Sequence, residues 1–340
     1  MKFKLIQLLL FLFLFFNENY FAQTYVEDFH LMHTNKITSN GYYGTINFLD
    51  SRSQKEDLGY VYSGPENKKV AVINKKDFST QLKSLVKKSI DSSNADGELL
   101  FQLRKFKFLE KPDVASEFGI CLFRANLYVK QDSTYKLLSK IDTIIIVEAS
   151  DVTKPLFETT GNVINNFVLI NLGKDFSNTE NFSFKQIVKI DSLEKSKLKL
   201  YTATQYSNGV YKTFESFKNQ IPDFRILEVV YKKEKLNGIK VLNAKGKKTK
   251  ISPNEFFAYI QENKAFISAE YDCYPLSKTD NDFYFKGEGK IPKEKYGAID
   301  GGPESENKTK ETTPEIQTAL YLIKIDHVDG SLMRIKQITN

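Results

Sequence analysis

The chain contains three histidines, and two of them are three residues apart. His30 and His33 lie beside Glu27 and Asp28, and zinc uses such side chains when their spacing brings them to one face. The neighbouring residues alternate as in a strand, in which residues three apart point to opposite faces. His327 has no cysteine or second histidine near it in the sequence. The sequence therefore predicts no metal site and no cofactor.

Cys121 and Cys273 are the only cysteines. A disulfide has to be considered because the chain is predicted below to reach an oxidising compartment. Each cysteine lies in an alternating apolar run, however, and the two belong to different predicted domains. A free cysteine is often a small buried hydrophobic residue. We therefore expect two buried thiols rather than one bond.

Nucleophilic and acid–base motifs give little support for an enzyme. The chain has neither a Gly-x-Ser-x-Gly sequence nor a glycine-rich phosphate loop. Three carboxylate pairs lie in polar turns or near a terminus, namely Glu27 with Asp28, Glu56 with Asp57, and Asp280 with Asp282. Glycosidase acids must oppose each other across a cleft, which a sequence cannot show. We predict no catalytic residue, and an envelope hydrolase acting on glycan or peptide through carboxylates remains the alternative.

The densest basic run lies in the C-terminal half of the chain. Its lysines are Lys245, Lys247, Lys248 and Lys250, with Lys232, Lys233 and Lys235 nearby. Both groups have the sequence of hairpin turns, where lysines commonly protect a sheet edge from aggregation. The other interpretation is contact with an anionic envelope glycan or lipid head group.

The first residues have the sequence of a secretory leader. Met1–Lys4 carries two lysines, Leu5–Phe16 is apolar apart from one glutamine, and Ala22 precedes Gln23. Twelve residues make about 18 Å of helix, too short for a hydrocarbon core of about 30 Å. An uncleaved membrane anchor is the alternative. We predict cleavage near Ala22 and Gln23, and a periplasmic, outer-membrane associated or secreted protein.

Composition supports a folded chain without a nucleic-acid partner. Hydrophobic residues make up 41% of the 340 residues, enough to bury a core. Lysine and arginine exceed aspartate and glutamate by 49 to 42, a surplus too small to indicate nucleic-acid binding. No later stretch approaches 18 consecutive apolar residues, so no transmembrane segment is predicted in the mature chain.

Hydrophobic periodicity predicts a domain of strands and two helices over residues 24–190. One helix begins after the capping residue Asp77, and a second runs from Val152 to Val168 with Pro155 in its first turn. The apolar phase changes near Arg104 and Lys105, which predicts a bulge. The predicted fold class is α+β, with an N-terminal antiparallel sheet covered by two helices and a β-rich second domain.

The second domain is predicted over residues 195–338 from short apolar strands separated by turns. Residues 291–315 lack a periodic apolar pattern and are predicted to form a mobile loop. The apolar segment 319–338 contains Asp329-Gly330, a strong two-residue turn signal, and is predicted to form a closing hairpin.

Residues 208–222 read Asn-Gly-Val-Tyr-Lys-Thr-Phe-Glu-Ser-Phe-Lys-Asn-Gln-Ile-Pro. This segment resembles a recurring one in an uncharacterised family of secreted proteins of Bacteroidetes-type bacteria. The resemblance covers about residues 195–338. Gln220 departs from the family's asparagine, and the chain lacks the tryptophan of the Trp-Gly pair that many relatives carry. The resemblance implies export but no activity.

The same segment has a structural interpretation, as a strand–turn–helix corner. Gly209 supplies a turn with positive φ, and Tyr211 belongs to the same corner. Phe214 and Phe217 share one side of a helical turn, and Pro222 prevents the helix from continuing. We therefore predict an extracytoplasmic, non-catalytic binding or envelope-associated module whose partner is another envelope protein or an anionic envelope glycan. A purely structural or assembly role remains a third possibility.

Overall fold

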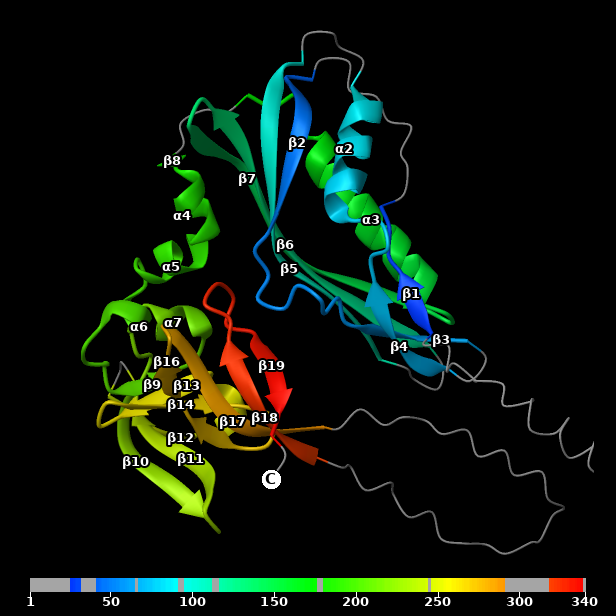
Figure 1. Cartoon of the computed structure of the whole chain (residues 1–340). Coiled ribbons are helices and arrows are strands. Elements are labelled where there is room, and N and C mark those ends of the chain that lie inside the picture. Colours follow the sequence, from blue (N-terminus) through cyan, green and yellow to red (C-terminus); the bar gives the residue numbers. More distant parts are fainter. Residues whose placement is uncertain are drawn as a thin grey trace, which may run out of the picture. The chain divides into compact units, whose positions relative to one another are not determined.

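The structure is a computed structural model that describes residues 25–31, 41–64, 67–90, 95–111, 116–175, 180–243, 246–290 and 318–338 (Figure 1). The predicted cleavage site at Ala22 and Gln23 and the predicted loop 291–315 lie outside these residues. The chain forms two compact units. Of the described residues, those up to Ser183 form the N-terminal unit and those from Phe184 onwards form the C-terminal unit.

The described part of the N-terminal unit contains two sheets and two helices. Its elements are β1 (Val26–Asp28), β2 (Tyr43–Asp50), β3 (Tyr60–Ser63), β4 (Lys68–Ile73), α2 (Phe78–Ser89), β5 (Gly97–Lys111), β6 (Glu117–Gln131), β7 (Thr134–Ala149), α3 (Thr153–Leu169) and β8 (Asn181–Phe182). The larger sheet has the strand order β2-β5-β6-β7-β8, and the smaller has the order β1-β4-β3.

The larger sheet is mixed rather than antiparallel. Strands β5 to β8 pair antiparallel in chain order, but β2 pairs parallel with β5. The prediction of an antiparallel sheet is wrong for β2. The connection from β2 to β5 passes through β3, β4 and α2, which is long enough for the crossover that a parallel pair needs. The predicted bulge is confirmed by a register shift between Leu103 and Lys105.

The two helices of this unit form where the periodicity predicts them. The Asp77 side chain caps α2 by accepting a hydrogen bond of 2.9 Å from the Thr80 N–H. Pro155 lies in the first turn of α3. Apolar residues of both helices share one core with inward residues of β5 and β6, including Leu82, Leu156 and the buried Cys121. Figure 1 shows α2 and α3 on the same side of the larger sheet.

The C-terminal unit is mostly strands. Its helical elements are α4 (Phe184–Val188), α5 (Ile190–Lys195), α6 (Lys199–Thr202), α7 (Phe214–Lys218) and a 3-10 turn (Pro253–Glu255). Its strands are β9 (Gly209–Tyr211), β10 (Arg225–Lys232), β11 (Lys235–Leu242), β12 (Lys248–Ile251), β13 (Ala258–Gln261), β14 (Lys264–Ser268), β15 (Cys273–Pro275), β16 (Ser277–Thr279), β17 (Asp282–Lys290), β18 (Thr318–Ile325) and β19 (Leu332–Gln337).

These strands form three sheets, with the orders β15-β14-β13-β9, β16-β17-β18-β19 and β10-β11-β12. The first two share a core of buried aromatic and branched side chains, and the third packs on a separate cluster around Ile239 and Tyr259. The hairpin β18–β19 extends the sheet by antiparallel pairing of β18 with β17. Among the described residues, no helix is long and apolar enough to cross a membrane.

Candidate functional site

The corner predicted from residues 209–222 lies in the core of the C-terminal unit. Tyr211 and Phe217 are fully buried, with ring centroids 5.3 Å apart. Gly209 has φ +152°, and a Cβ there would lie 2.4 Å from Cβ of Pro222. Phe214 is also buried. Because these side chains contact one another, the corner has a packing role and presents no reactive group.

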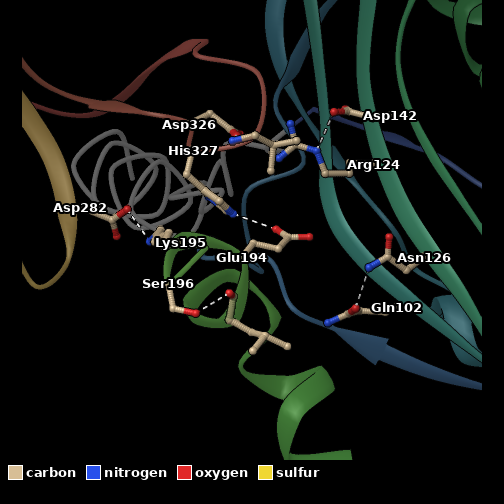
Figure 2. Close-up of polar contacts among 12 residues, drawn as sticks. Gln102, Arg124, Asn126, Asp142, Glu194, Lys195, Ser196, Asp282, Asp326 and His327 are labelled. Atoms are coloured by element: carbon tan, nitrogen blue, oxygen red, sulfur yellow. Dashed lines mark hydrogen bonds and ion pairs between the residues drawn. The ribbon is translucent and has the colours of Figure 1, made fainter. Parts of the chain in front are cut away.

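Only one of the two histidines of the His-x-x-His motif lies within the described residues. His30 is exposed just after β1, and His33 lies outside the described residues. His327 is instead buried, and its Nε2 lies 2.9 Å from Oε2 of Glu194 on α5 (Figure 2). Asp191, one helical turn away, has a carboxylate oxygen within 4.8 Å of these ligand atoms. No sequence pattern predicts this trio, because Glu194 and His327 are 133 positions apart.

A buried ion triad lies in the same unit. Asp282 accepts hydrogen bonds of 2.6 Å from Lys195 and 2.8 Å from Lys324, one on each carboxylate oxygen. Figure 2 shows the Lys195 contact. Asp282 and Lys195 are both buried. The neighbouring Tyr201 hydroxyl is also buried, and burial together with Asp282 and Asp326 raises its pKa. These contacts satisfy the ions internally, which favours a structural role for the triad.

The N-terminal unit has a polar pocket of about 390 Å³ between β3, the start of β6 and the start of α3. Its lining is rich in carboxylates and hydroxyls, formed by Glu27, Tyr62, Ser63, Gly64, Asn67, Glu117, Ser150, Asp151, Thr153 and Lys154. Two of the carboxylates are engaged within the unit. Glu27 accepts a hydrogen bond from the Ser63 hydroxyl, and Glu117 accepts from the Asn67 amide and the Val152 N–H.

Glu110 lies behind this pocket wall and is only 3% exposed. The Thr153 Oγ1 is 2.9 Å from Oε2 of Glu110 and 3.1 Å from the carbonyl oxygen of Tyr62. The Thr153 hydroxyl donates to Glu110 and shares its single proton with the Tyr62 carbonyl oxygen. This shared hydrogen bond compensates only partly for the burial of the Glu110 carboxylate.

The pKa of Glu110 favours the neutral form of the acid. Burial raises the pKa of its carboxyl to about 7, hydrogen bonds from Tyr62 and Thr153 lower it, and the charges of Glu117 and Asp151 raise it further. Its Oε1 has no hydrogen-bond partner within the described part of the chain. Glu110 carries no local sequence signal, because its partners Tyr62 and Thr153 lie on β3 and α3, far away along the chain.

The most distinctive surface is a face of the three-stranded sheet β10-β11-β12, which we call the basic sheet. Residues 225–251 contain nine basic and two acidic residues, a net charge of +7. The whole chain also has a net charge of +7, so the rest of the chain is balanced. The described basic residues of this segment are all exposed, namely Arg225, Lys232, Lys233, Lys235, Lys240, Lys247, Lys248 and Lys250.

Strand register places part of this charge on one face. Lys240 on β11 lies directly opposite Lys250 on β12. Like charges in that position repel, and only Lys240 has an ionic partner, Glu228, at 2.7 Å. The alternate residues Ile239 and Ile251 are buried on the other face. The sheet is thus amphipathic, with an apolar inner face and a cationic outer face. A count of charged residues by segment would have revealed the basic surplus of residues 225–251 from the sequence.

Neither a family model nor a curated protein sequence matches the chain. Among solved structures, the crystal structure of a Xanthomonas campestris protein of family DUF330 is similar to part of the chain. The two share 10% sequence identity with a TM-score of 0.30, over 50% of this chain and 99% of that chain. A superposition this loose says nothing about the function or the site residues of this chain.

Proposed function

We propose that the protein is an exported, non-catalytic binding module of the bacterial cell envelope, and that its basic sheet binds an anionic envelope glycan. The observation that carries this proposal is the charge distribution, because residues 225–251 hold a surplus equal to that of the whole chain. The segment lies within residues 195–338, which resemble secreted Bacteroidetes-type proteins. In this proposal the α+β unit, with two helices on one face of its sheet, is joined to a β-rich unit that carries the binding face.

The shape of the face suits a polymer better than a small ion. Neighbouring strands are about 4.8 Å apart, and outward residues along one strand are about 6.8 Å apart, so cationic groups form a flat array. Such an array can contact several anionic groups of an extended chain simultaneously. Exposed lysines contribute little singly, and their attraction to a polyanion is screened by salt.

Export is part of the proposal. The basic start, the apolar run Leu5–Phe16 and the small residue Ala22 support cleavage at a secretory leader. N-terminal sequencing of the exported protein is expected to begin at Gln23 or Thr24. Intact Met1 recovered in a membrane pellet would contradict it.

The binding experiment compares a polyanion with a neutral polymer. The exported chain should bind polygalacturonate but not dextran, and binding should weaken as salt rises from ~50 to ~500 mM. A variant with Lys240→Gln, Lys248→Gln and Lys250→Gln should bind at least about tenfold more weakly, since each exposed charge contributes roughly 0.5 kcal/mol. A control variant with Lys83→Gln, Lys87→Gln and Lys199→Gln removes the same charge from exposed positions elsewhere.

Two outcomes would change the conclusion. Binding to vesicles of phosphatidylglycerol, but not to polygalacturonate, would identify a lipid surface as the partner instead. If neither probe binds at low salt, or if both triple variants weaken binding equally, the basic sheet is not a recognition surface.

A hydrolase that uses carboxylates is the second candidate, and the polar pocket is the observation that favours it. Glu27, Glu117 and Asp151 line the pocket, and Glu110 behind it has the raised pKa of a general acid. Against this, Glu27 and Glu117 already accept hydrogen bonds from the protein. Release of reducing ends from a glycan, lost in a folded Glu110→Gln variant, would establish hydrolysis.

A further inference from the structure

Strand β7 leaves most of one edge without a partner. On the side away from β6, β8 pairs with β7 only at Tyr135 and Lys136. No other described strand pairs with the segment from Leu137 to Ala149 on that side. An edge of this length presents a row of backbone N–H and C=O groups that can pair with another chain.

The same edge is unusually apolar. Its centre reads Ile144-Ile145-Ile146-Val147, without proline or glycine. Ile144 is 61% exposed and Ile146 is 64% exposed, both on the outer face of the sheet. Open edges are commonly protected by charges, proline or a bulge. In β7 the charged residues Lys140, Asp142 and Glu148 and a register shift between Leu137 and Ser139 flank the apolar centre without interrupting it. An apolar open edge of this kind is typical of a surface that a further strand covers.

Side-chain alternation restricts how a second copy can pair with this edge. Paired residues of an antiparallel ladder point to the same face of a sheet. Even-numbered residues of this segment face outward, so a two-fold pairing must place even residues opposite even residues. A register centred on Ile144 places Lys140 opposite Glu148 of the second copy, and the symmetry repeats that pair. A register centred on Ile145 would pair Ile144 with Ile146 but would place the two acids Asp142 and Glu148 opposite each other.

The charges of the free chain fit the register centred on Ile144. Lys140 is exposed and makes no ion pair with the described residues. Asp142 is already held by Arg124 at 3.0 Å, as Figure 2 shows, so it does not compete for Lys140. Ile144 meets its symmetry mate at the axis, and Ile146 lies opposite Asp142 of the second copy. Joining two five-stranded sheets gives about ten strands, within the range of natural open sheets.

We propose that the protein forms a homodimer in which β7 pairs antiparallel with β7 of a second copy, around a two-fold axis at Ile144. The interface is independent of the proposed glycan binding. Where both hold, the dimer carries two basic sheets, and two linked contacts to one polymer raise the apparent affinity.

The test is the mass of the purified full chain in solution, measured by light scattering after size-exclusion chromatography. The chain should elute with about twice its monomer mass of 39.1 kDa. Ile144→Lys places two ammonium groups at the axis and should give a monomer. Ile144 is exposed, so the circular dichroism of that variant should be unchanged and the variant should still unfold cooperatively.

Charge exchange tests the register. Lys140→Glu and Glu148→Lys should each weaken the dimer, because each places like charges opposite one another. The double variant Lys140→Glu with Glu148→Lys should restore it. Lys83→Glu on α2 is the matched control and should leave the dimer intact. A monomeric wild-type chain, a dimer that survives Ile144→Lys, or a double variant no better than the single ones would each overturn the proposal.

Discussion

The two units of the molecule each bury a carboxylate, in opposite ways. Glu110 in the N-terminal unit has only neutral hydrogen-bond donors, the Tyr62 backbone and the Thr153 hydroxyl, and burial raises its pKa to about 7. Asp282 in the C-terminal unit lies between the ammonium groups of Lys195 and Lys324. The first arrangement is stable when the acid is neutral, and the second only when all three groups are charged. The first unit should therefore respond to pH, and the second to the loss of an ionic partner.

The largest expected effect is that of Asp282→Asn. The substitution leaves the buried ammonium of Lys195 without its counter-charge, which costs about 3–5 kcal/mol. The free energy of unfolding of the C-terminal unit, measured by urea denaturation, should fall by that amount. Glu228→Gln is the control, because it breaks an ion pair with Lys240 whose side chains are more than half exposed. That control should cost less than about 1 kcal/mol.

A double variant separates the loss of the charge from the loss of the pair. Lys195→Met with Asp282→Leu replaces the two most buried ions of the triad by apolar groups of similar size, which is often nearly neutral, and leaves Lys324, whose side chain is 17% exposed. It should recover most of the stability that Asp282→Asn loses. Equal losses in the single and double variants would show that the triad is not held together as an ion pair.

The next largest effect is the pH dependence conferred by Glu110. Its pKa is higher in the folded state, so the folded state binds more protons between about pH 4.5 and 7. Stability contributed by the neutral acid is therefore fully present below about pH 4.5 and is lost as the pH rises towards 7. Glu110→Gln cannot ionise. It should be close to neutral at pH 4 and stabilising by about 2–3 kcal/mol at pH 8.

The measurement is the difference in unfolding free energy between Glu110→Gln and wild type at several pH values. The exposed Glu56→Gln serves as the control and should give a small difference without this slope. A Glu110→Gln variant that is equally destabilised at both pH values would mean that Glu110 is ionised throughout and that its partners, not its neutrality, hold it in place.

Local sequence patterns predicted the two long helices and the bulge. They could not predict polar contacts between residues far apart in the sequence. The period of apolar residues predicted α2 and α3, and a change of phase predicted the bulge after Leu103. The partners of Glu110 and Glu194 lie 43 and 133 positions away, and no periodicity links such positions. The parallel pairing of β2 with β5 depends on a crossover that strand composition does not specify. The charge surplus of residues 225–251 was readable from the sequence, but only by counting acids together with bases.

A smaller effect compares a glycine from each unit. Gly64 in the N-terminal unit and Gly209 in the C-terminal unit both have positive φ. A Cβ at Gly64 would meet nothing within 4 Å, whereas one at Gly209 would lie 2.4 Å from Cβ of Pro222. Gly209→Ala should therefore cost about 2 kcal/mol, through strain and overpacking, and Gly64→Ala about 1 kcal/mol. Equal losses on urea denaturation would remove the packing role assigned to the corner.

The two thiols allow the units to be compared by their rates of alkylation rather than by stability. Both cysteines are free, Cys121 buried in the N-terminal unit and Cys273 half-buried in the C-terminal unit. Burial raises the pKa of Cys121 to about 12 and that of Cys273 to about 11. Because the thiolate is the reactive form, both should alkylate slowly at pH 8, and Cys121 at least about tenfold more slowly than Cys273. Both should react completely on unfolding without reductant, and a peptide map that joins them through a disulfide would contradict this.

The labelling rate of Cys121 also connects back to Glu110. Cys121 is fully buried, so it reacts only after the N-terminal unit opens, and its rate reports the stability of that unit. Glu110→Gln should therefore slow the labelling of Cys121 at pH 8 but not at pH 4.5, after correction for the thiolate fraction. Cys273 should be unaffected, because it belongs to the other unit. A change in both labelling rates would mean that the two units unfold together. The effects of Glu110 and Asp282 on stability could then not be attributed to one unit each.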